Sequence, residues 1–157
     1  MVTDEEFRSA MSRFASGVTV MTTADAAGRP HGITVSAFCS VSMTPPMVLA
    51  CIHKETASHY AFLERAAFVV HILGEHQQQI SQQFAEPAMD KFDGTQIYES
   101  TEGLPMLADA LVMLECSVSS VHDAGDHTII VGLVENADIR AGAPLIYYHH
   151  DYRKIKD

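Results

Sequence analysis

The sequence contains little cysteine, and its cysteines lack the spacing of a metal site or a disulfide framework. Cys39, Cys51 and Cys116 are far apart, lie among apolar neighbours and form no Cys-x-x-Cys pair. Zinc knuckles and small disulfide-bonded domains are therefore not indicated. The pattern favours structural thiols in a reducing cytoplasm.

Long apolar runs and positive charge are scarce as well. No hydrophobic segment approaches the roughly 18 residues of a membrane span, and the opening residues MVTDEEFRSAM are acidic where a signal peptide is basic. Lys and Arg number 10 against 20 Asp and Glu, which gives a formal net charge of -10. Nucleic-acid binding needs clustered cations, so we expect a cytoplasmic protein with no membrane and no nucleic-acid partner.

The remaining composition is that of one globular domain. The chain has 157 residues, 47% of them hydrophobic, which is enough to build a core without disulfides or metals. We therefore expect a single domain over residues 1–157. The nine histidines show no metal-ligand spacing on one expected face, so no metal is predicted.

Periodicity predicts short strands with helices at their ends. A Thr-x-x-Glu capping box, Thr3 with Glu6, begins a helix that is expected to end at Gly17. Two further helices are expected over residues 56–66 and 75–85. Strands are expected over residues 18–23, 32–43, 46–52 (fully buried), 67–73, 111–121, 127–137 and 144–150. Because exposed sheet edges need protection, this pattern favours a closed or split barrel, a mainly β fold with short flanking helices.

The longest expected strand, residues 32–43, alternates between two kinds of side chain. Its odd positions are apolar: Ile33, Val35, Ala37, Cys39, Val41 and Met43. Its even positions are small hydroxyl residues around one aromatic ring: Thr34, Ser36, Phe38, Ser40 and Ser42. The hydroxyl face is either solvated or satisfies the polar edge of a flat heterocycle. Because so long a strand is unusual, a bulge or kink is expected between residues 37 and 40.

The segment HKETAS follows the next strand and leads into a helix. Lys54, Thr56 and Ser58 are the residues expected of an anion site there, since a helix start favours phosphate. Ordinary capping by Thr56 or Ser58, with Lys54 in solvent, explains the same residues equally well.

Ordered motifs along the chain match one known family. They are FASGVTVMTT, GRPHGITVSAFCSVSMTPPMVLACI, KETAS, AFVVHIL, QQFA, KFDG, GLPMLADALVMLEC, GDHTIIVGLVENA and LIYYHHDYRKI. Together they resemble the flavin reductase-like family of FMN-binding split barrels, and the resemblance covers nearly the whole chain. It implies a homodimeric reductase of the kind that serves two-component monooxygenases.

The resemblance also assigns residues. Those it places around the flavin are Thr34, Val35, Ser36 and Ala37 along the isoalloxazine, Ser40, Val41 and Ser42 toward the phosphate, and Phe84 and Lys91 near the flavin or the second subunit. Cys51 and Ile52 are expected in the core, with packing of the flavin ring on them as a second role. The resemblance agrees with the phosphate role of Lys54, Thr56 and Ser58. Ser36 stands where many relatives carry Asn. His127, in a Gly-Asp-His motif at a hairpin tip, would lie near the nicotinamide.

The implied activity is that of an NAD(P)H:flavin oxidoreductase. FMN or FAD would take a hydride from NADH or NADPH, and reduced flavin would diffuse to a partner monooxygenase. Proximity of the two rings suffices for this step, which agrees with the lack of a catalytic triad or carboxylate pair. Two alternatives stay open: a pyridoxamine-phosphate-oxidase-like oxidase, which the unclustered Lys and Arg disfavour, and a non-catalytic flavin- or haem-binding split-barrel module.

Overall fold

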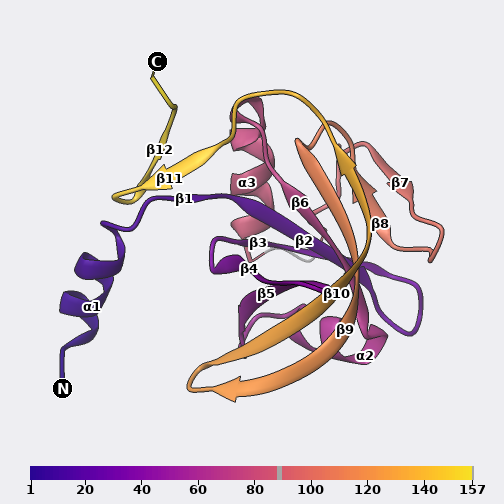
Figure 1. Cartoon of the computed structure of the whole chain (residues 1–157), viewed down its shortest axis with the longest axis horizontal. Helices are drawn as coiled ribbons and strands as arrows, with labels where there is room; N and C mark the ends of the chain where they lie inside the picture. Colours follow the sequence, from indigo (N-terminus) through magenta and orange to yellow (C-terminus); the bar gives the residue numbers. More distant parts are fainter. Residues whose placement is uncertain (88–89, 157) are drawn as a thin grey trace.

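The computed structural model describes residues 1–87 and 90–156, which form a mainly β fold with three short α-helices (Figure 1). The helices are α1 (Asp4–Met11), α2 (His59–Arg65) and α3 (Gln78–Ala85), the last preceded by a 3-10 turn at Glu75–Gln77. The strands are β1 (Ser16–Gly17), β2 (Thr19–Ala24), β3 (Pro30–Val35), β4 (Phe38–Met43), β5 (Pro46–His53), β6 (Ala67–Ile72), β7 (Ile97–Glu99), β8 (Pro105–Leu107), β9 (Val112–Ala124), β10 (His127–Ile139), β11 (Ile146–Tyr148) and β12 (Asp151–Arg153).

A seven-stranded antiparallel sheet in the order β3-β2-β6-β9-β10-β5-β4 builds the body of the fold. Its two edge strands, β3 and β4, are consecutive in the chain and separated only by Ser36 and Ala37. The sheet must therefore curl until its edges meet at that break, as in a barrel that is split at one seam. The predicted split-barrel fold class is confirmed.

Alternating side chains explain why the sheet encloses a core. The main cluster takes one face of six strands together with α2 and consists of Met21, Ile33, Val35, Val48, Ala50, Ile52, Phe62, Phe68, Val70, Cys116 and Ile130. A second cluster lies under α3 and includes Val18, Val20, Leu73, Phe84, Leu107 and Leu145. Burial of these apolar side chains is the main driving force for the curled sheet.

The first helix stands apart from this body (Figure 1). Thr3 and Glu6 form the predicted capping box, with the Glu6 N–H donating to Thr3 Oγ1 at 3.2 Å and the Thr3 N–H donating to Glu6 Oε2 at 2.8 Å. The helix ends at Met11 instead of Gly17, and none of its residues is buried. Besides its cap and local propensity, the helix is held at its C-terminal end, where the His149 N–H donates to the Ser12 carbonyl at 2.8 Å.

Other expected elements differ in extent. The strand β5 alternates between buried and half-buried positions, so the prediction that it is fully buried was wrong: only one of its faces meets the core. The very short strands β1, β7, β8 and β12 were not expected, because two or three residues carry no readable period. Within the described residues, no helix is long and apolar enough to cross a bilayer.

The long expected strand is broken, as the predicted kink requires, and the break reverses which residues face the core. Ser36 and Ala37 belong to no strand, and the Phe38 N–H donates to the Ser36 carbonyl at 2.9 Å. Beyond the break Phe38 packs against the main core. The apolar positions that were expected to be buried there are exposed instead: Cys39, Val41 and Met43. The apolar odd positions of this segment therefore do not share one buried face, because the two irregular residues change the phase of the pleat.

Candidate functional site

A cavity of about 270 Å³ opens where β3, β5, the end of α3 and the β9–β10 hairpin meet. Its lining residues are Ile33, Thr34, Val35, Ser36, Ala37, Cys51, Ile52, His53, Thr56, Phe84, Ala85, Lys91 and His127. Backbone groups, hydroxyls, one ammonium and two imidazoles therefore surround an apolar floor. That is the usual make-up of a site for a planar polar ligand.

The alternation of side chains along β3 and β5 determines which residues face the cavity. Val35 and Ile52 point into the main core, so their neighbours Thr34 and Cys51 turn to the other side. The Cys51 N–H donates to the Ala37 carbonyl at 3.0 Å, which fixes the irregular residues against β5. Burial, with a smaller contribution from nearby Cys39, raises the pKa of the Cys51 thiol. Cys51 is thus an apolar wall of the cavity and a poor nucleophile at neutral pH.

One end of the cavity is formed by α3 and the segment that follows it. Gly32 makes this possible, because a Cβ atom there would lie 2.5 Å from Cε1 of Phe84. The Phe84 ring is fully buried and stacks edge-on against Phe92, with centroids 5.0 Å apart. Lys91 Nζ donates to the Phe84 carbonyl at 3.0 Å. Partial burial lowers the pKa of Lys91, with the charge of Glu86 acting in the opposite direction.

The opposite end of the cavity is the tip of the β9–β10 hairpin. Gly125 adopts φ +63°, the left-handed conformation that the turn needs and that glycine tolerates best. The next residues carry the polar groups: His127 Nδ1 lies 2.7 Å from Asp126 Oδ1, and His53 Nε2 from β5 lies 3.7 Å from Asp126 Oδ2. The hydrogen bond from His127 lowers the pKa of the Asp126 carboxyl, and the charges of both histidines add to it.

Of the predicted anion-site residues, only Thr56 lines the cavity. Lys54 holds the hairpin tip: its backbone N–H donates to the Asp126 carbonyl at 2.9 Å, and its ammonium contacts Gly125 O and the Asp123 carboxylate. Its side chain is therefore already engaged beside the cavity. A phosphate role for Lys54 stays a prediction.

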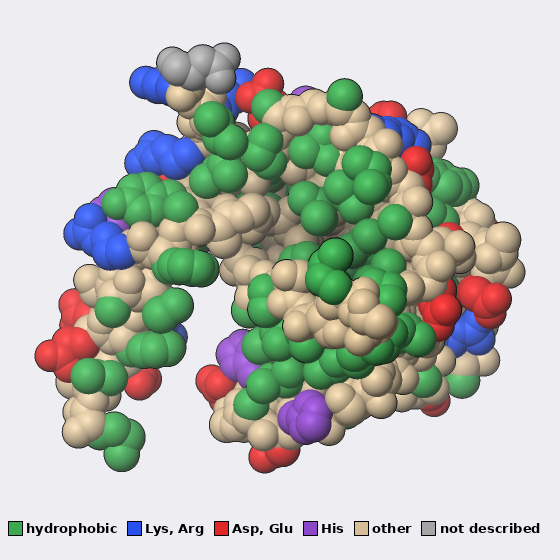
Figure 2. All heavy atoms as spheres, in the orientation of Figure 1, with side chains coloured by type: hydrophobic (Ala, Val, Ile, Leu, Met, Phe, Trp, Pro, Cys, Tyr) green, Lys and Arg blue, Asp and Glu red, His purple; other side chains and the backbone are tan. Residues whose placement is uncertain are grey.

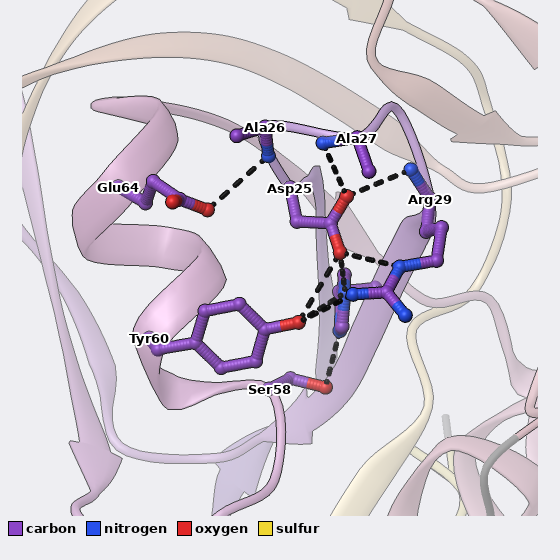
Figure 3. Close-up of polar contacts among 8 residues, drawn as sticks. Asp25, Ala26, Ala27, Arg29, Ser58, Tyr60 and Glu64 are labelled. Atoms are coloured by element: carbon purple, nitrogen blue, oxygen red, sulfur yellow. Dashed lines mark hydrogen bonds and ion pairs between the residues drawn. The ribbon is translucent and has the colours of Figure 1, made fainter.

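Ser58 lies outside the cavity lining and belongs to a separate polar network at the start of α2 (Figure 3). Its hydroxyl is 3.3 Å from His31 Nδ1, and it forms no capping hydrogen bond. At the centre of this network is Asp25, whose oxygens bind Arg29, His31 and the Tyr60 hydroxyl. Burial opposes ionisation of Asp25, but the hydrogen bonds from Arg29 and His31 outweigh it and lower the pKa of its carboxyl.

The remaining predicted cradle residues, Ser40, Val41 and Ser42, lie on the edge strand β4, past the break and outside the cavity lining. Ser40 and Val41 are exposed, and Ser42 accepts a hydrogen bond from the Thr44 N–H at 3.3 Å. Their position leaves them free to meet a ligand that extends beyond the cavity. Their part in flavin binding stays a prediction.

The structure thus brings most predicted site residues together around one cavity: Thr34, Val35, Ser36, Ala37, Cys51, Ile52, Thr56, Phe84, Lys91 and His127. Sequence reasoning missed His53, because a single histidine at a strand end is usually a solvated residue. Nothing in the sequence singled it out, although it is the first residue of the HKETAS motif. Across residues 1–87 and 90–156, no three His, Cys, Asp or Glu side chains group as metal ligands do; the absence of a metal stays a prediction.

A curled antiparallel sheet with a cavity at the break between its edge strands defines a split-barrel domain of the flavin-binding type, and comparison with known proteins gives the family. Residues 11–156 match the model of the flavin reductase like domain. The chain therefore belongs to the flavin reductase-like family, and the resemblance drawn from its motifs is confirmed.

Individual relatives agree with this placement. The chain is 41% identical over 143 residues to the reductase component of 4-nitrophenol 4-monooxygenase/4-nitrocatechol 2-monooxygenase from Rhodococcus opacus, covering 91% of this chain and 76% of that protein. It is 39% identical over 127 residues to a probable flavin reductase of Rhizobium meliloti, covering 81% of this chain but only 41% of the length of that protein.

A solved structure shows the same fold. The NADH:FAD oxidoreductase of Streptomyces globisporus, determined in complex with NAD and FAD fragments, superposes with a TM-score of 0.92 at 30% identity. The match covers 99% of this chain and 97% of that one.

Proposed function

We propose that this chain is an NADH:flavin oxidoreductase that binds FMN or FAD in the cavity between β3, β5 and the β9–β10 hairpin. The observation that carries the proposal is that cavity, with its apolar floor and polar ends, in a chain that matches the flavin reductase family along almost its whole length. Relatives named as NADH flavin reductases support the nicotinamide substrate.

The cavity fits a flavin ring by its chemistry. Thr34, Ser36 and the backbone of Ala37 offer donors and acceptors along one wall, and Cys51 offers an apolar surface. The redox chemistry comes from the flavin and the nicotinamide, between which the hydride passes. The task of the chain is to hold the two rings face to face and to exclude water from between them.

The cavity contains a positively charged side chain although the chain as a whole is acidic. The chain carries a net charge of -10, which repels a phosphorylated ligand at long range. Among the described residues that line the cavity, Lys91 is the only Lys or Arg. We assign Lys91 to the flavin ring or its phosphate, where its half-buried ammonium offsets the unfavourable overall charge.

The direct test is steady-state oxidation of NADH and NADPH by the purified chain with added FMN or FAD, in a two-by-two comparison. We expect flavin-dependent oxidation with at least one pair. A non-catalytic flavin- or haem-binding module would show binding without NAD(P)H oxidation. A pyridoxamine-phosphate-oxidase-like oxidase would instead oxidise pyridoxamine phosphate and keep its FMN through gel filtration.

A matched pair of variants tests the location. Cys51→Phe places a ring in the cavity, whereas Cys39→Phe places the same ring on the exposed edge strand outside it. We expect Cys51→Phe to weaken FMN binding at least tenfold and Cys39→Phe to leave it unchanged, as measured by fluorescence titration. Equal affinities of the two folded variants would contradict the location.

Reduced flavin is then passed to a flavin-dependent monooxygenase. Relatives that are reductase components of monooxygenases support this step. Coupled assays with a monooxygenase and no other reductant test it. A chain that retains reduced flavin through many turnovers would contradict diffusion to a partner.

Two further expectations remain proposals. A homodimer is supported by α1 and the residues just after it, where the large apolar side chains Phe7, Met11 and Phe14 are 59%, 51% and 74% exposed. Figure 2 shows hydrophobic side chains on the surface of this arm of the molecule. A second copy of the chain would cover them, which light scattering after gel filtration tests. A cytoplasmic location is supported by three free cysteines.

A further inference from the structure

A second cavity, of about 540 Å³, opens where the start of β6, the β9–β10 pair and the loop between β7 and β8 meet. Its lining residues are Ala67, Glu102, Leu104, Glu115, Cys116, Ser117, Glu135 and Asn136, none of which is among the described residues that line the cavity proposed for the flavin. The floor is apolar, because Leu104 and Cys116 are almost completely buried. Burial, followed by the charges of Glu135 and Glu115, raises the pKa of the Cys116 thiol to about 12. The floor is therefore uncharged at neutral pH, and the polar groups around it are three carboxylates, one hydroxyl and one amide.

An irregularity in the β9–β10 pairing lies at this cavity. The register shifts between Val134 and Asn136, so Glu135 is an extra residue in the register. The Ser117 hydroxyl donates to Glu135 Oε1 at 2.7 Å, which fixes the carboxylate beside the cavity. Glu115 lines the same cavity from β9, where it is paired with Asn136. Bulges of this kind are common where a sheet re-aims side chains toward a site.

Glu115 carries a buried carboxylate oxygen that lacks a donor among the described residues. Its Oε2 atom is buried, and across residues 1–87 and 90–156 no donor lies within hydrogen-bond distance of it. Among the ion pairs of this part of the chain, none includes Glu102, Glu115 or Glu135. Arg65, at the end of α2, donates instead to the backbone carbonyl of Glu102 at 2.6 Å. Because a buried polar atom without a hydrogen bond is costly, a ligand that donates to Glu115 Oε2 would gain a contact without breaking an existing one.

We propose that this second cavity binds a small organic cation, an ammonium or guanidinium group on an apolar body, whose N–H groups donate to Glu115 Oε2 and to the Glu135 carboxylate. The apolar body covers the floor at Leu104 and Cys116. The net charge of -10 attracts such a ligand at long range. A cavity of this volume is of the size that encloses a drug-like molecule, whereas one Lys or Arg side chain of a partner protein would leave most of it empty. The observations therefore favour a small molecule over a protein side chain.

The test uses three probes that share a phenyl body and differ in the head group: phenethylamine is a cation, phenethyl alcohol is neutral and phenylpropionate is an anion. Titration of the isotope-labelled chain, followed by NMR, gives each Kd and shows which backbone amides respond. We expect phenethylamine to bind about ten- to a hundredfold more tightly than phenethyl alcohol, the value of a charge-assisted hydrogen bond. Phenylpropionate is expected not to bind at this cavity. The responding amides are expected on β9 and β10, around Glu115 and Glu135.

Glu115→Gln separates a ligand-binding role from a structural role, because the two roles predict opposite changes in stability. The amide has the same shape but removes a buried charge without a partner, so the variant is expected to have a higher melting temperature and to lose the preference for the amine. Replacement of a carboxylate that served the fold would instead lower the melting temperature. Glu135→Gln is expected to weaken amine binding as well and serves if Glu115→Gln does not fold. Glu99→Gln, on β7 and outside the cavity lining, is the control and is expected to change neither property.

Several outcomes would overturn the proposal. They are an absence of detectable phenethylamine binding, equal affinities for the amine and the alcohol, and an amine preference that survives in Glu115→Gln. Tighter binding of the amide of Nα-acetyl-lysine, whose side-chain ammonium is free, would assign the cavity to a basic side chain of a partner protein and overturn the small-molecule class. Oxidation of NAD(P)H with added flavin is expected to be the same in Glu115→Gln and the parent, so the binding result stands whether or not the proposed function holds.

Discussion

Two regions of the molecule use histidine in opposite ways. His71 on β6 is fully buried between strands: its Nδ1 is 3.0 Å from the Val20 carbonyl, and its Nε2 accepts the Leu107 N–H at 3.0 Å. His127 at the hairpin tip keeps 40% of its side chain exposed and shares one carboxylate with His53. The first imidazole joins β2, β6 and β8 inside the core, and the second borders the cavity.

The difference shows where polar groups can be changed without loss of the fold. Both nitrogens of His71 are satisfied by the backbone, so a replacement that lacks a donor and an acceptor leaves buried partners without hydrogen bonds. At the rim, water can replace every lost contact, so the chain can vary polar groups there for ligand recognition. Stability is therefore expected to depend on the core histidine and activity on the rim histidines.

The largest expected effect is the pH dependence of the core. Burial lowers the pKa of His71 to about 4, with the hydrogen bond to Val20 acting in the opposite direction, whereas an unfolded histidine titrates near 6.5. As pH falls, the unfolded chain binds this proton first. Its stabilising contribution is therefore complete above about pH 6.5 and is lost as pH falls toward 4, by about 3 kcal/mol. Urea unfolding at pH 7.5 and 4.5, at one protein concentration, measures it.

His71→Gln is the control for that measurement. A glutamine keeps a donor and an acceptor but does not titrate, so this variant is expected to be less stable at neutral pH and to lose less stability in acid. An identical pH dependence in parent and variant would show that His71 is not the group responsible.

The next largest effect is expected for Gly32→Ala, because this substitution affects both the buried core and the wall of the cavity. Gly32→Ala introduces a Cβ atom 2.5 Å from the buried Phe84 ring and 3.2 Å from Phe92. Overpacking of this kind costs about 1 to 3 kcal/mol, and the displaced ring lies at the cavity wall. We expect a lower melting temperature together with weaker FMN binding. Gly17→Ala, which meets no atom within 4 Å, is expected to leave both unchanged, and equal behaviour of the two variants would contradict this.

The core strands β2, β6, β9 and β10 could be predicted from runs of β-branched and apolar residues between turn signals. Only some of them alternate: β10 does so over its first half, whereas β2 is buried at every position. Periodicity failed at β4, because Ser36 and Ala37 interrupt the strand and change the phase of the pleat. The number of residues in such an interruption cannot be predicted from the sequence. Periodicity also failed for contacts between distant segments: Ser58 reads as a helix cap, yet its hydroxyl meets His31 from β3. The cavity residues were predicted through the family motifs, whereas His53 is recognised only by its distance to Asp126.

A smaller effect is expected at the rim. If His127 contacts the nicotinamide, as the family resemblance implies, His127→Ala is expected to lower kcat/KM for NADH by the equivalent of about 1 kcal/mol. The melting temperature and the flavin Kd are expected to stay unchanged. Stopped-flow reduction of bound flavin across a range of NADH concentrations measures it. His122→Ala on the same hairpin is the control. Parent rates in His127→Ala at every concentration would remove His127 from the site.

The smallest effect on stability is expected for substitution of Cys39, because substitutions at exposed positions usually change the free energy of unfolding by less than about 0.5 kcal/mol. Its environment contrasts with that of the other thiols. Burial raises the pKa of Cys116 to about 12, with Glu135 and Glu115 adding to the shift, whereas Cys39 is exposed on the edge strand. Alkylation is therefore expected first at Cys39, later at Cys51 and at Cys116 only after unfolding.

Repeating the alkylation in the presence of FMN tests whether the flavin binds in the cavity. Cys51 lines the cavity and Cys39 lies outside it, so saturating FMN is expected to slow alkylation of Cys51 and to leave that of Cys39 unchanged. Peptide mapping by mass spectrometry follows both sites in one sample, with Cys39 as the internal control. Equal protection of the two thiols would indicate a general tightening of the fold, and protection of Cys39 alone would move the flavin to β4. Protection confined to Cys51 places the ligand on the wall that β5 provides.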